Sequence, residues 1–165
     1  MICCIDANIF IWGIKKQCAA GQEINIEKAA YLFELMDKKN DKIMIPAVVL
    51  AEILAPEPLE KHPIIMDAIS KNIMLVDFDK RCASQYAFLF TNKIEELKKT
   101  AKDNNIDNQK MKLDHLIIAS AIVGGAKCIY SEDKGIKTFG QKHIEVRKLP
   151  DLPTSQKDLF GNLIR

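Results

Sequence analysis

Short apolar runs alternate along the chain with longer stretches in which apolar residues recur at helical spacing. The short runs are rich in isoleucine, valine and cysteine, as is typical of buried strands. They occupy residues 2–5, 43–45, 73–78, 127–131 and 144–149. Strands that alternate with helices predict an α/β domain built on a mostly parallel sheet.

The stretches between the strands predict the helices and their ends. Asn25 is a plausible N-cap, Pro46 suits a first helical turn, and Asp79 can cap a long helix that ends at the turn residues 103–108. Gly124 and Gly125 suit a helix C-terminus. The expected helices cover residues 26–37, 47–54, 59–70, 79–101 and 113–123, with a further short helix within 154–165.

A length of 165 residues with 48% hydrophobic content is sufficient for one core. We therefore expect a single domain over residues 1–149, which includes the helical segment 79–112, followed by a C-terminal tail over 150–165. No apolar run approaches the roughly 20 residues that span a bilayer. The sequence predicts a soluble, cytoplasmic protein that has no membrane partner.

Composition excludes several classes of site. With 24 basic and 22 acidic residues the formal net charge is +2, which is too balanced to indicate nucleic-acid binding by itself. The five cysteines are an odd number and form no CxxC pair. Neither a disulfide framework nor a zinc site is therefore expected.

Four acidic residues stand where an apolar run begins, ends or is interrupted. Asp6 closes the first run, and Glu52 is the one polar side chain between Ala47 and Ala55. Asp114 opens the helical run 113–123, and Asp133 follows the fourth strand-like run. Because functional groups in open α/β sheets collect at the carboxyl ends of the strands, we expect these four acids to meet at one edge.

Gathered carboxylates repel one another unless a cation compensates them. Oxygen ligands select magnesium or manganese, which can activate water for phosphodiester hydrolysis. Taken singly, Asp6 and Asp133 could equally be helix N-caps, and Asp114 could be a first-turn partner of the helix dipole. Glu52 is harder to explain in this way, because an unpaired carboxylate in a buried apolar helix would cost several kcal/mol, by rough estimate.

The acids also lie in four motifs that resemble those of PIN-domain ribonucleases, and in particular toxins of the VapC type. The likeness spans nearly the whole chain. The motifs are Ile5-Asp6-Ala7-Asn8-Ile9-Phe10, Pro46-Ala47-Val48-Val49-Leu50-Ala51-Glu52-Ile53, Asp114-His115-Leu116-Ile117-Ile118-Ala119-Ser120-Ala121 and Ile129-Tyr130-Ser131-Glu132-Asp133.

The resemblance implies a PIN-like, three-layer α/β/α fold with a five-stranded parallel sheet. It also implies Mg²⁺, or possibly Mn²⁺, held by Asp6, Glu52, Asp114 and Asp133, with Asn8 supporting the ligands through hydrogen bonds. Ser131 would share this supporting role, although the family more often carries Thr there. A homodimer, an antitoxin partner and endonucleolytic hydrolysis of RNA are further implications.

Lysines near the motifs are candidates for contacts with RNA phosphates. They are Lys15, Lys16, Lys110 and Lys112, and solvated lysines near helix ends are an equally good interpretation of each. Lys110 and Lys112 stand just before Asp114, where relatives often carry glycine. The resulting hypothesis is a metal-dependent endoribonuclease toxin; the alternatives are a ribosomal or transfer RNA processing nuclease and a non-catalytic PIN-like scaffold that binds RNA or a partner.

Overall fold

The computed structural model describes residues 1–91 and 93–153. Within them, five strands form one all-parallel sheet in the order β3-β2-β1-β4-β5. This confirms the α/β class and the parallel five-stranded sheet that the sequence predicted. The strands are β1 Ile2–Ile5, β2 Lys42–Pro46, β3 Ile73–Val76, β4 Cys128–Tyr130 and β5 Glu145–Arg147.

The first strand lies at the centre of the sheet. Cys3 of β1 pairs with Ile43 of β2 on one side and with Cys128 of β4 on the other. Because β1 is covered on both faces and flanked on both edges, it can be apolar throughout. The aspartate that follows it is therefore carried to the middle of the carboxyl edge.

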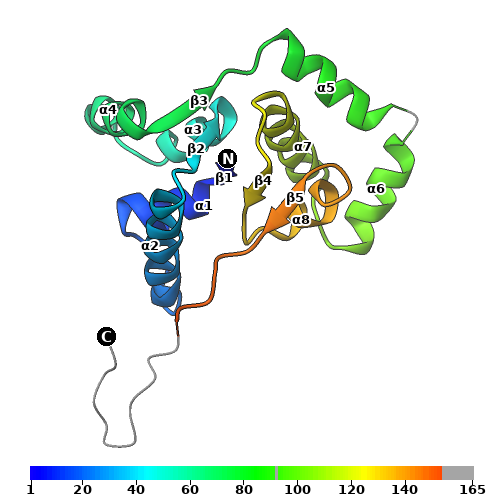
Figure 1. Cartoon of the computed structure of the whole chain (residues 1–165). Helices are drawn as coiled ribbons and strands as arrows, with labels where there is room; N and C mark the ends of the chain where they lie inside the picture. The colour runs from blue at the N-terminus through cyan, green and yellow to red at the C-terminus, as the bar shows by residue number, and fades with distance from the viewer. Residues whose placement is uncertain (92, 154–165) are drawn as a thin grey trace, which may run out of the picture.

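Helices cover both faces of the sheet (Figure 1). The helices α2 and α4 lie on one side, and α7 and α8 lie on the other. This division follows from right-handed crossovers, because the chain moves toward β3 first and returns past β1 later. The helical elements are α1 Ala7–Phe10, the π-helix η1 Ile11–Lys15, α2 Glu23–Lys38, α3 Ala47–Leu54, the 3₁₀-helix η2 Leu59–Lys61, α4 His62–Asn72, α5 Lys80–Phe90, α6 Ile94–Asp103, α7 Asn108–Val123 and α8 Lys134–Gly140.

Two helices begin earlier than the sequence predicted. The helix expected from residue 26 starts at Glu23, so Asn25 lies inside α2 and Gln22 precedes it. The helix expected from residue 113 starts at Asn108, because the Asp107 side chain accepts hydrogen bonds from the N–H groups of Gln109 and Lys110. The predicted turn over 103–108 is thus shorter than expected, since its last acid is the N-cap of α7.

The long helix expected over residues 79–101 is in fact two helices. Asp79 caps α5 as predicted, through hydrogen bonds from the N–H groups of Arg81 and Cys82. The helix ends at Thr91, whose ψ of 119° leaves the helical region, and α6 begins at Ile94. A continuous apolar stripe does not reveal this break, because α5 and α6 both turn apolar side chains toward the same neighbours. Figure 1 shows the two helices as an outer layer beside α7.

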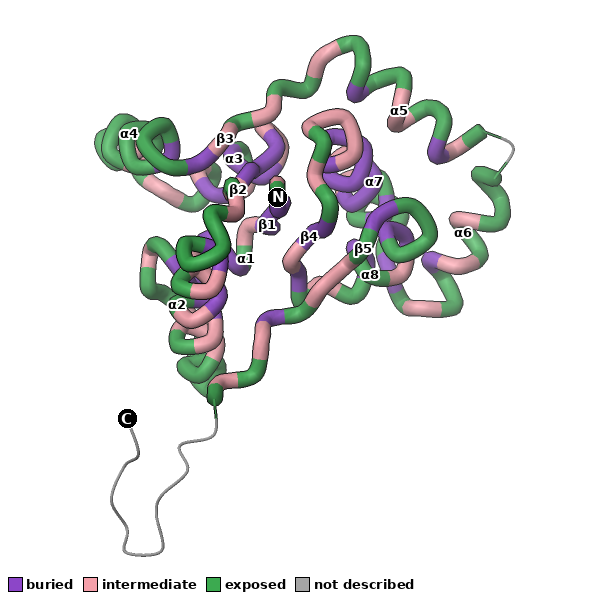
Figure 2. The backbone as a smooth tube through the Cα atoms, viewed as in Figure 1, coloured by how far each residue is buried: buried purple, intermediate pink, exposed green. Residues whose placement is uncertain are grey.

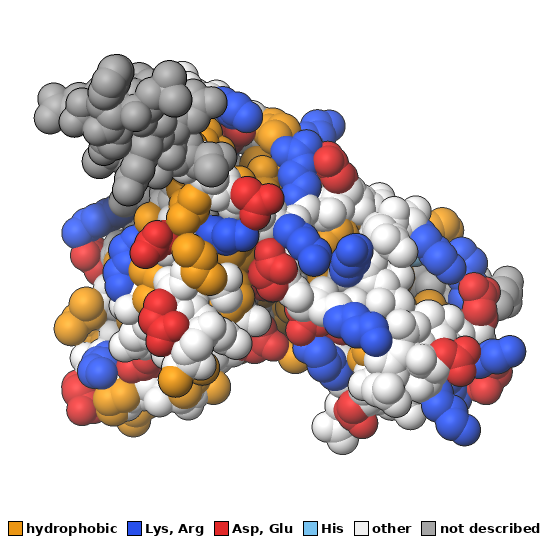
Figure 3. Space-filling model, turned by 90° about the horizontal axis from the view of Figure 1, so that it is seen from below, with side chains coloured by type: hydrophobic (Ala, Val, Ile, Leu, Met, Phe, Trp, Pro, Cys, Tyr) orange, Lys and Arg blue, Asp and Glu red, His pale blue; other side chains and the backbone are white. Residues whose placement is uncertain are grey.

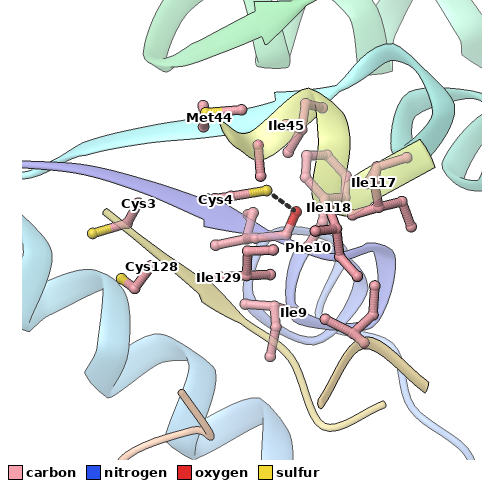
Figure 4. Close-up of a cluster of buried hydrophobic side chains, with 14 of the residues drawn as sticks. Cys3, Cys4, Ile9, Phe10, Met44, Ile45, Ile117, Ile118, Cys128 and Ile129 are labelled. Carbon is pink, nitrogen blue, oxygen red and sulfur yellow. Dashed lines mark hydrogen bonds between the residues drawn. The ribbon is translucent and has the colours of Figure 1, made fainter. Parts of the chain in front are cut away.

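The core lies between the sheet and the helices on its two faces. Figure 4 shows Ile117 and Ile118 of α7 packed close to the strand residues Cys4 and Ile129. Cys3, Cys4 and Cys128 are free thiols with no exposed surface, as expected for small buried hydrophobes. In Figure 2 the inner helix α7 is mostly buried, whereas α5 and α6 are mostly exposed. This burial fixes α7, which carries one of the four acids.

None of the helices within the described residues combines the length and apolar composition that crossing a bilayer requires. The division into a domain over 1–149 and a tail over 150–165 stays a prediction. The short helix expected within 154–165 lies outside the described residues.

Candidate functional site

A cavity of about 340 Å³ opens at the carboxyl edge of the sheet, and all four acids line it. They come from four separate places in the chain, namely the end of β1, helix α3, helix α7 and the loop after β4. The structure thus brings these four acids together, as their positions near strand ends predicted. The lining residues are Asp6, Ala7, Asn8, Glu52, Lys110, Asp114, Ile117, Asp133 and Ile136.

Asp6 is both a helix cap and a wall of the cavity. Its Oδ1 accepts a hydrogen bond of 3.0 Å from the N–H of Ile9 and so caps α1. Its Oδ2 accepts a hydrogen bond from the hydroxyl of Ser131, which lies beyond the neighbouring strand β4. Burial raises the pKa of Asp6 to about 6, even though both hydrogen bonds oppose the rise.

Asp133 divides its two oxygens in the same way. Its Oδ1 accepts hydrogen bonds from the N–H groups of Gly135 (2.6 Å) and Ile136 (3.4 Å), which caps α8. Its Oδ2 lies 2.6 Å from Nζ of Lys110. Burial alone would raise the pKa of Asp133, but Lys110 and the N–H of Gly135 outweigh it and hold the pKa below its usual value. The capping interpretation and the site interpretation therefore both apply to Asp6 and Asp133.

Asp114 is the least satisfied of the four acids. It is 3% exposed, and its Oδ2 is buried without a hydrogen-bond partner among the described residues. Burial, together with the neighbouring carboxylates, raises the pKa of Asp114 to about 7 against the opposing charge of Lys110. Because α7 begins at Asn108, Asp114 lies well inside the helix, and its interpretation as a first-turn dipole partner is wrong.

Glu52 is less buried than the sequence predicted. The apolar run of α3 suggested a helix that is buried all round, but Ala51 is exposed and Glu52 is half-buried. The reason is that α3 begins at the carboxyl end of β2, where one side of the helix faces the mouth of the cavity. Burial raises the pKa of Glu52, with Lys110 opposing the rise. Asp114, and not Glu52, is thus the acid that is buried with an unpartnered oxygen.

Gly135 shapes the site, although sequence reasoning missed it. An added Cβ at this position would lie 1.9 Å from Oδ2 of Asp114 and 3.1 Å from Oδ1 of Asp133. The absence of a side chain thus lets the start of α8 approach the Asp114 carboxylate. A glycine two residues after the last acid was the available signal.

The two predicted supporting residues, Ser131 and Asn8, differ in their contacts with the acids. Ser131 donates to Asp6 and accepts from the N–H of Asp133 at 2.9 Å, so it joins two acids. Asn8 is exposed at the cavity wall, and its predicted hydrogen bond to a ligand stays a prediction.

Of the candidate lysines, Lys15 forms an ion pair with Glu57 and lines a different pocket. Lys16 and Lys112 are exposed on the surface.

Lys110 has a contact that the sequence interpretation did not anticipate. Lys110 was a candidate for contact with RNA phosphates or a solvated lysine, yet its Nζ lies 2.6 Å from Oδ2 of Asp133 and 3.9 Å from Oδ1 of Asp114. The four-residue spacing between Lys110 and Asp114 was a signal for the longer of these contacts, because such residues share a helix face. The shorter contact, with Asp133, has no such signal in the sequence.

His115, beside Asp114, takes no part in the cavity. Its ring lies between Phe90 and Phe139, with centroid separations of 4.5 Å and 4.9 Å. Its Nδ1 lies 2.7 Å from the carbonyl oxygen of Met111. Burial lowers its pKa, so the ring is a neutral packing element.

The donor set fits a hard divalent cation. Carboxylate oxygens are the ligands that Mg²⁺ and Mn²⁺ prefer, and the unpartnered Oδ2 of Asp114 is a buried acceptor that such an ion would satisfy. Within residues 1–91 and 93–153, however, no three acidic, histidine or cysteine side chains are placed so as to hold a metal ion as they stand. Loading would therefore require the carboxylates to move closer together.

Comparison with known proteins gives the fold. No family model matches the chain, and no curated protein matches its sequence. Among solved structures, the chain is similar to one in the crystal structure of VapBC2 from Rickettsia felis bound to a DNA fragment from the promoter. The TM-score is 0.59 with 21% sequence identity, over 91% of this chain and 100% of the other. This chain therefore shares the VapBC2 chain's α/β fold, the one expected from the PIN-like motifs.

Proposed function

We propose that the protein is a metal-dependent endoribonuclease of PIN-domain type that acts as the toxin of a toxin–antitoxin pair. The observation that carries this proposal is the cavity at the carboxyl edge, where carboxylates from four elements meet around the unpartnered Oδ2 of Asp114. Burial, with the neighbouring acids adding to it, raises the pKa of Asp6 and Asp114. Acids perturbed in this way within a cleft are typical of functional sites. The shared fold with a chain of a VapBC complex supports the toxin role.

A bound Mg²⁺ or Mn²⁺ would lower the pKa of a water and neutralise charge at an RNA phosphate. Asp6 and Asp114, from the centre of the sheet and from α7, would hold it directly, with Glu52 and Asp133 as further ligands at the mouth. Ser131 would orient Asp6 through its hydrogen bond. The exposed Lys16 and Lys112 remain candidates for contacts to RNA phosphates.

The face of the molecule seen in Figure 3 carries acidic and basic side chains interspersed. RNA affinity would therefore come from a few local lysines rather than from a broad basic surface. The similarity to a chain of the VapBC2 complex supports an antitoxin partner. From the resemblance to PIN-domain toxins we also propose a homodimer and an antitoxin segment that reaches the acidic cavity.

The decisive experiment compares purified wild type with Asp114→Asn in Mg²⁺ or Mn²⁺, with end-mapping of the RNA fragments. We expect wild type to cut RNA and Asp114→Asn to be inactive while still folded. Asp67→Asn is the matched control, because Asp67 is exposed on α4 and pairs with Lys71 away from the cavity. A folded wild type that leaves RNA intact at millimolar Mn²⁺ would contradict the proposal.

Expression in cells separates the toxin from a nuclease that matures ribosomal or transfer RNA. Growth arrest that Asp6→Asn relieves supports the toxin, whereas normal growth with altered RNA ends supports processing.

One observation favours the non-catalytic scaffold as a second candidate. Lys110 already neutralises part of the acid cluster, and no preformed metal geometry is present among the described residues. A scaffold would show no rise in melting temperature with millimolar Mn²⁺, because stabilisation follows from binding to the native state. The nuclease would show a rise, and Asp114→Asn would abolish it.

A further inference from the structure

Lys110 lies beside the acids of the cavity, at a position in α7 where a basic residue is unfavourable for the helix. It belongs to the first turn of α7, near the positive end of the helix dipole, which favours acidic rather than basic residues. A lysine four residues before an aspartate is also the less favourable order for an ion pair on a helix. Local helix energetics therefore do not account for Lys110.

The cavity does account for it. Nζ of Lys110 lies 2.6 Å from Oδ2 of Asp133 and 3.9 Å from Oδ1 of Asp114, so one ammonium group joins acids from α7 and from the cap of α8. Its charge also opposes the raised pKa of Glu52. Three of the four cavity acids are thus influenced by this one cation.

The backbone of Lys110 is anchored in the helix, whereas its side chain is half-exposed and can turn away from the acids into solvent. Its N–H donates a 3.2 Å hydrogen bond to Oδ2 of the N-cap Asp107, which anchors the residue in the helix. The side chain is 48% exposed, while that of Asp114 is 4% exposed. A flexible four-carbon stem on an anchored residue can swing into solvent without moving α7.

We propose that Lys110 is a tethered counter-ion, which occupies the cation position of the cavity in the metal-free protein and which a divalent ion must displace. The inference rests on the metal site of the proposed function. Its consequence is that metal affinity is set by competition with the lysine, and that loading releases a positive side chain at the rim of the site.

The first test is metal binding without RNA. Mn²⁺ is titrated at pH 8.5, where the carboxylates are ionised, and free Mn²⁺ is counted by electron paramagnetic resonance. Lys110→Met keeps the apolar stem and removes the charge, so we expect its Mn²⁺ dissociation constant to fall about three- to tenfold. Lys71→Met, which removes a lysine paired with Asp67 on α4 away from the cavity, should bind like wild type.

The second test uses the unmodified chain and does not depend on the folding of a variant. Lysine amines are acetylated with and without saturating Mg²⁺, and the modified peptides are quantified by mass spectrometry. Metal should raise the acetylation rate of Lys110 several-fold, because its ammonium is released from the carboxylates. Lys112 in the same samples should not change.

The two tests distinguish a failure of the counter-ion role of Lys110 from a failure of the proposed metal site. Wild type that binds Mn²⁺ while Lys110→Met binds equally or more weakly would overturn the counter-ion role and leave the nuclease proposal standing. Unchanged Lys110 acetylation in a protein that Mg²⁺ stabilises thermally would overturn it as well. Wild type that binds no Mn²⁺ would overturn the metal site and the inference together.

Discussion

The hydroxyl of Ser131 donates a hydrogen bond to Oδ2 of Asp6, joining two residues that are 125 positions apart in the chain. The bond connects the ends of the adjacent strands β1 and β4 at the centre of the sheet. It holds the Asp6 carboxylate in one orientation, with Oδ1 directed to the cap of α1.

Replacing Ser131 with Ala should disturb Asp6 in particular. Loss of the hydroxyl removes an interaction that lowers the pKa of Asp6, so this pKa should rise above about 6. We expect unfolding free energy to fall by about 1–2 kcal/mol and Mn²⁺ affinity to weaken. Carboxyl carbon NMR titration measures the pKa. Ser120→Ala is the control, since the Ser120 hydroxyl donates to the carbonyl of Leu116 within α7. An unchanged pKa of Asp6 in Ser131→Ala would contradict the hydrogen bond between Ser131 and Asp6.

Asp114→Asn should stabilise the metal-free protein although it destroys the site. At pH 8 the Asp114 carboxylate is ionised, buried and near other acids, and a neutral amide relieves that repulsion. The expected gain is on the order of 1 kcal/mol, measured by urea unfolding in EDTA. Adding Mn²⁺ should reverse the ranking, because wild type alone binds it. A variant that is less stable than wild type in EDTA would show that Asp114 is structural.

The contribution of Asp6 and Asp114 to the stability of the metal-free protein should fall as pH rises from about 4 to about 7. Their pKa values are raised to about 6 and about 7, so in this range these two carboxyls bind more protons in the folded protein than in the unfolded chain. Stability decreases with pH wherever the native state holds the extra protons. Melting temperatures in EDTA between pH 4 and pH 8 test this. Asp114→Asn should show a shallower decrease, and an equally steep one would contradict the assignment.

Gly135→Ala should damage the cavity through contact rather than charge. The new Cβ would lie 1.9 Å from Oδ2 of Asp114, so the carboxylate or the start of α8 must shift. We expect a loss of roughly 1–3 kcal/mol of stability and weaker Mn²⁺ binding. Gly140→Ala, on the same helix, is the control because its added Cβ would meet Val146 and Ile118 at 3.1 Å and 3.4 Å. Calorimetry and Mn²⁺ titration compare the two, and equal Mn²⁺ affinity in both variants would argue against the close approach.

The periodicity of apolar residues predicted the strands well and the helix ends less well. All five short runs became strands of one parallel sheet, and the central strands β1 and β4 are buried on both faces, which is why they are apolar throughout. The starts of α2 and α7 were placed too late, since Glu23 and Asn108 precede the first apolar residue of each stripe. A cap depends on which N–H groups a side chain reaches, and periodicity does not record that.

The sequence alone determined the fold class and which acids stand beside strand ends, because the positions of the strands along the chain follow from the spacing of apolar residues. Only the tertiary structure decided how those acids share their charge. It left Glu52 at the cavity mouth, buried Oδ2 of Asp114 without a partner, and brought Lys110 onto Asp133 from another helix. The physical reason is that desolvation and ion pairing depend on distances across the fold, which residue spacing along the chain does not fix.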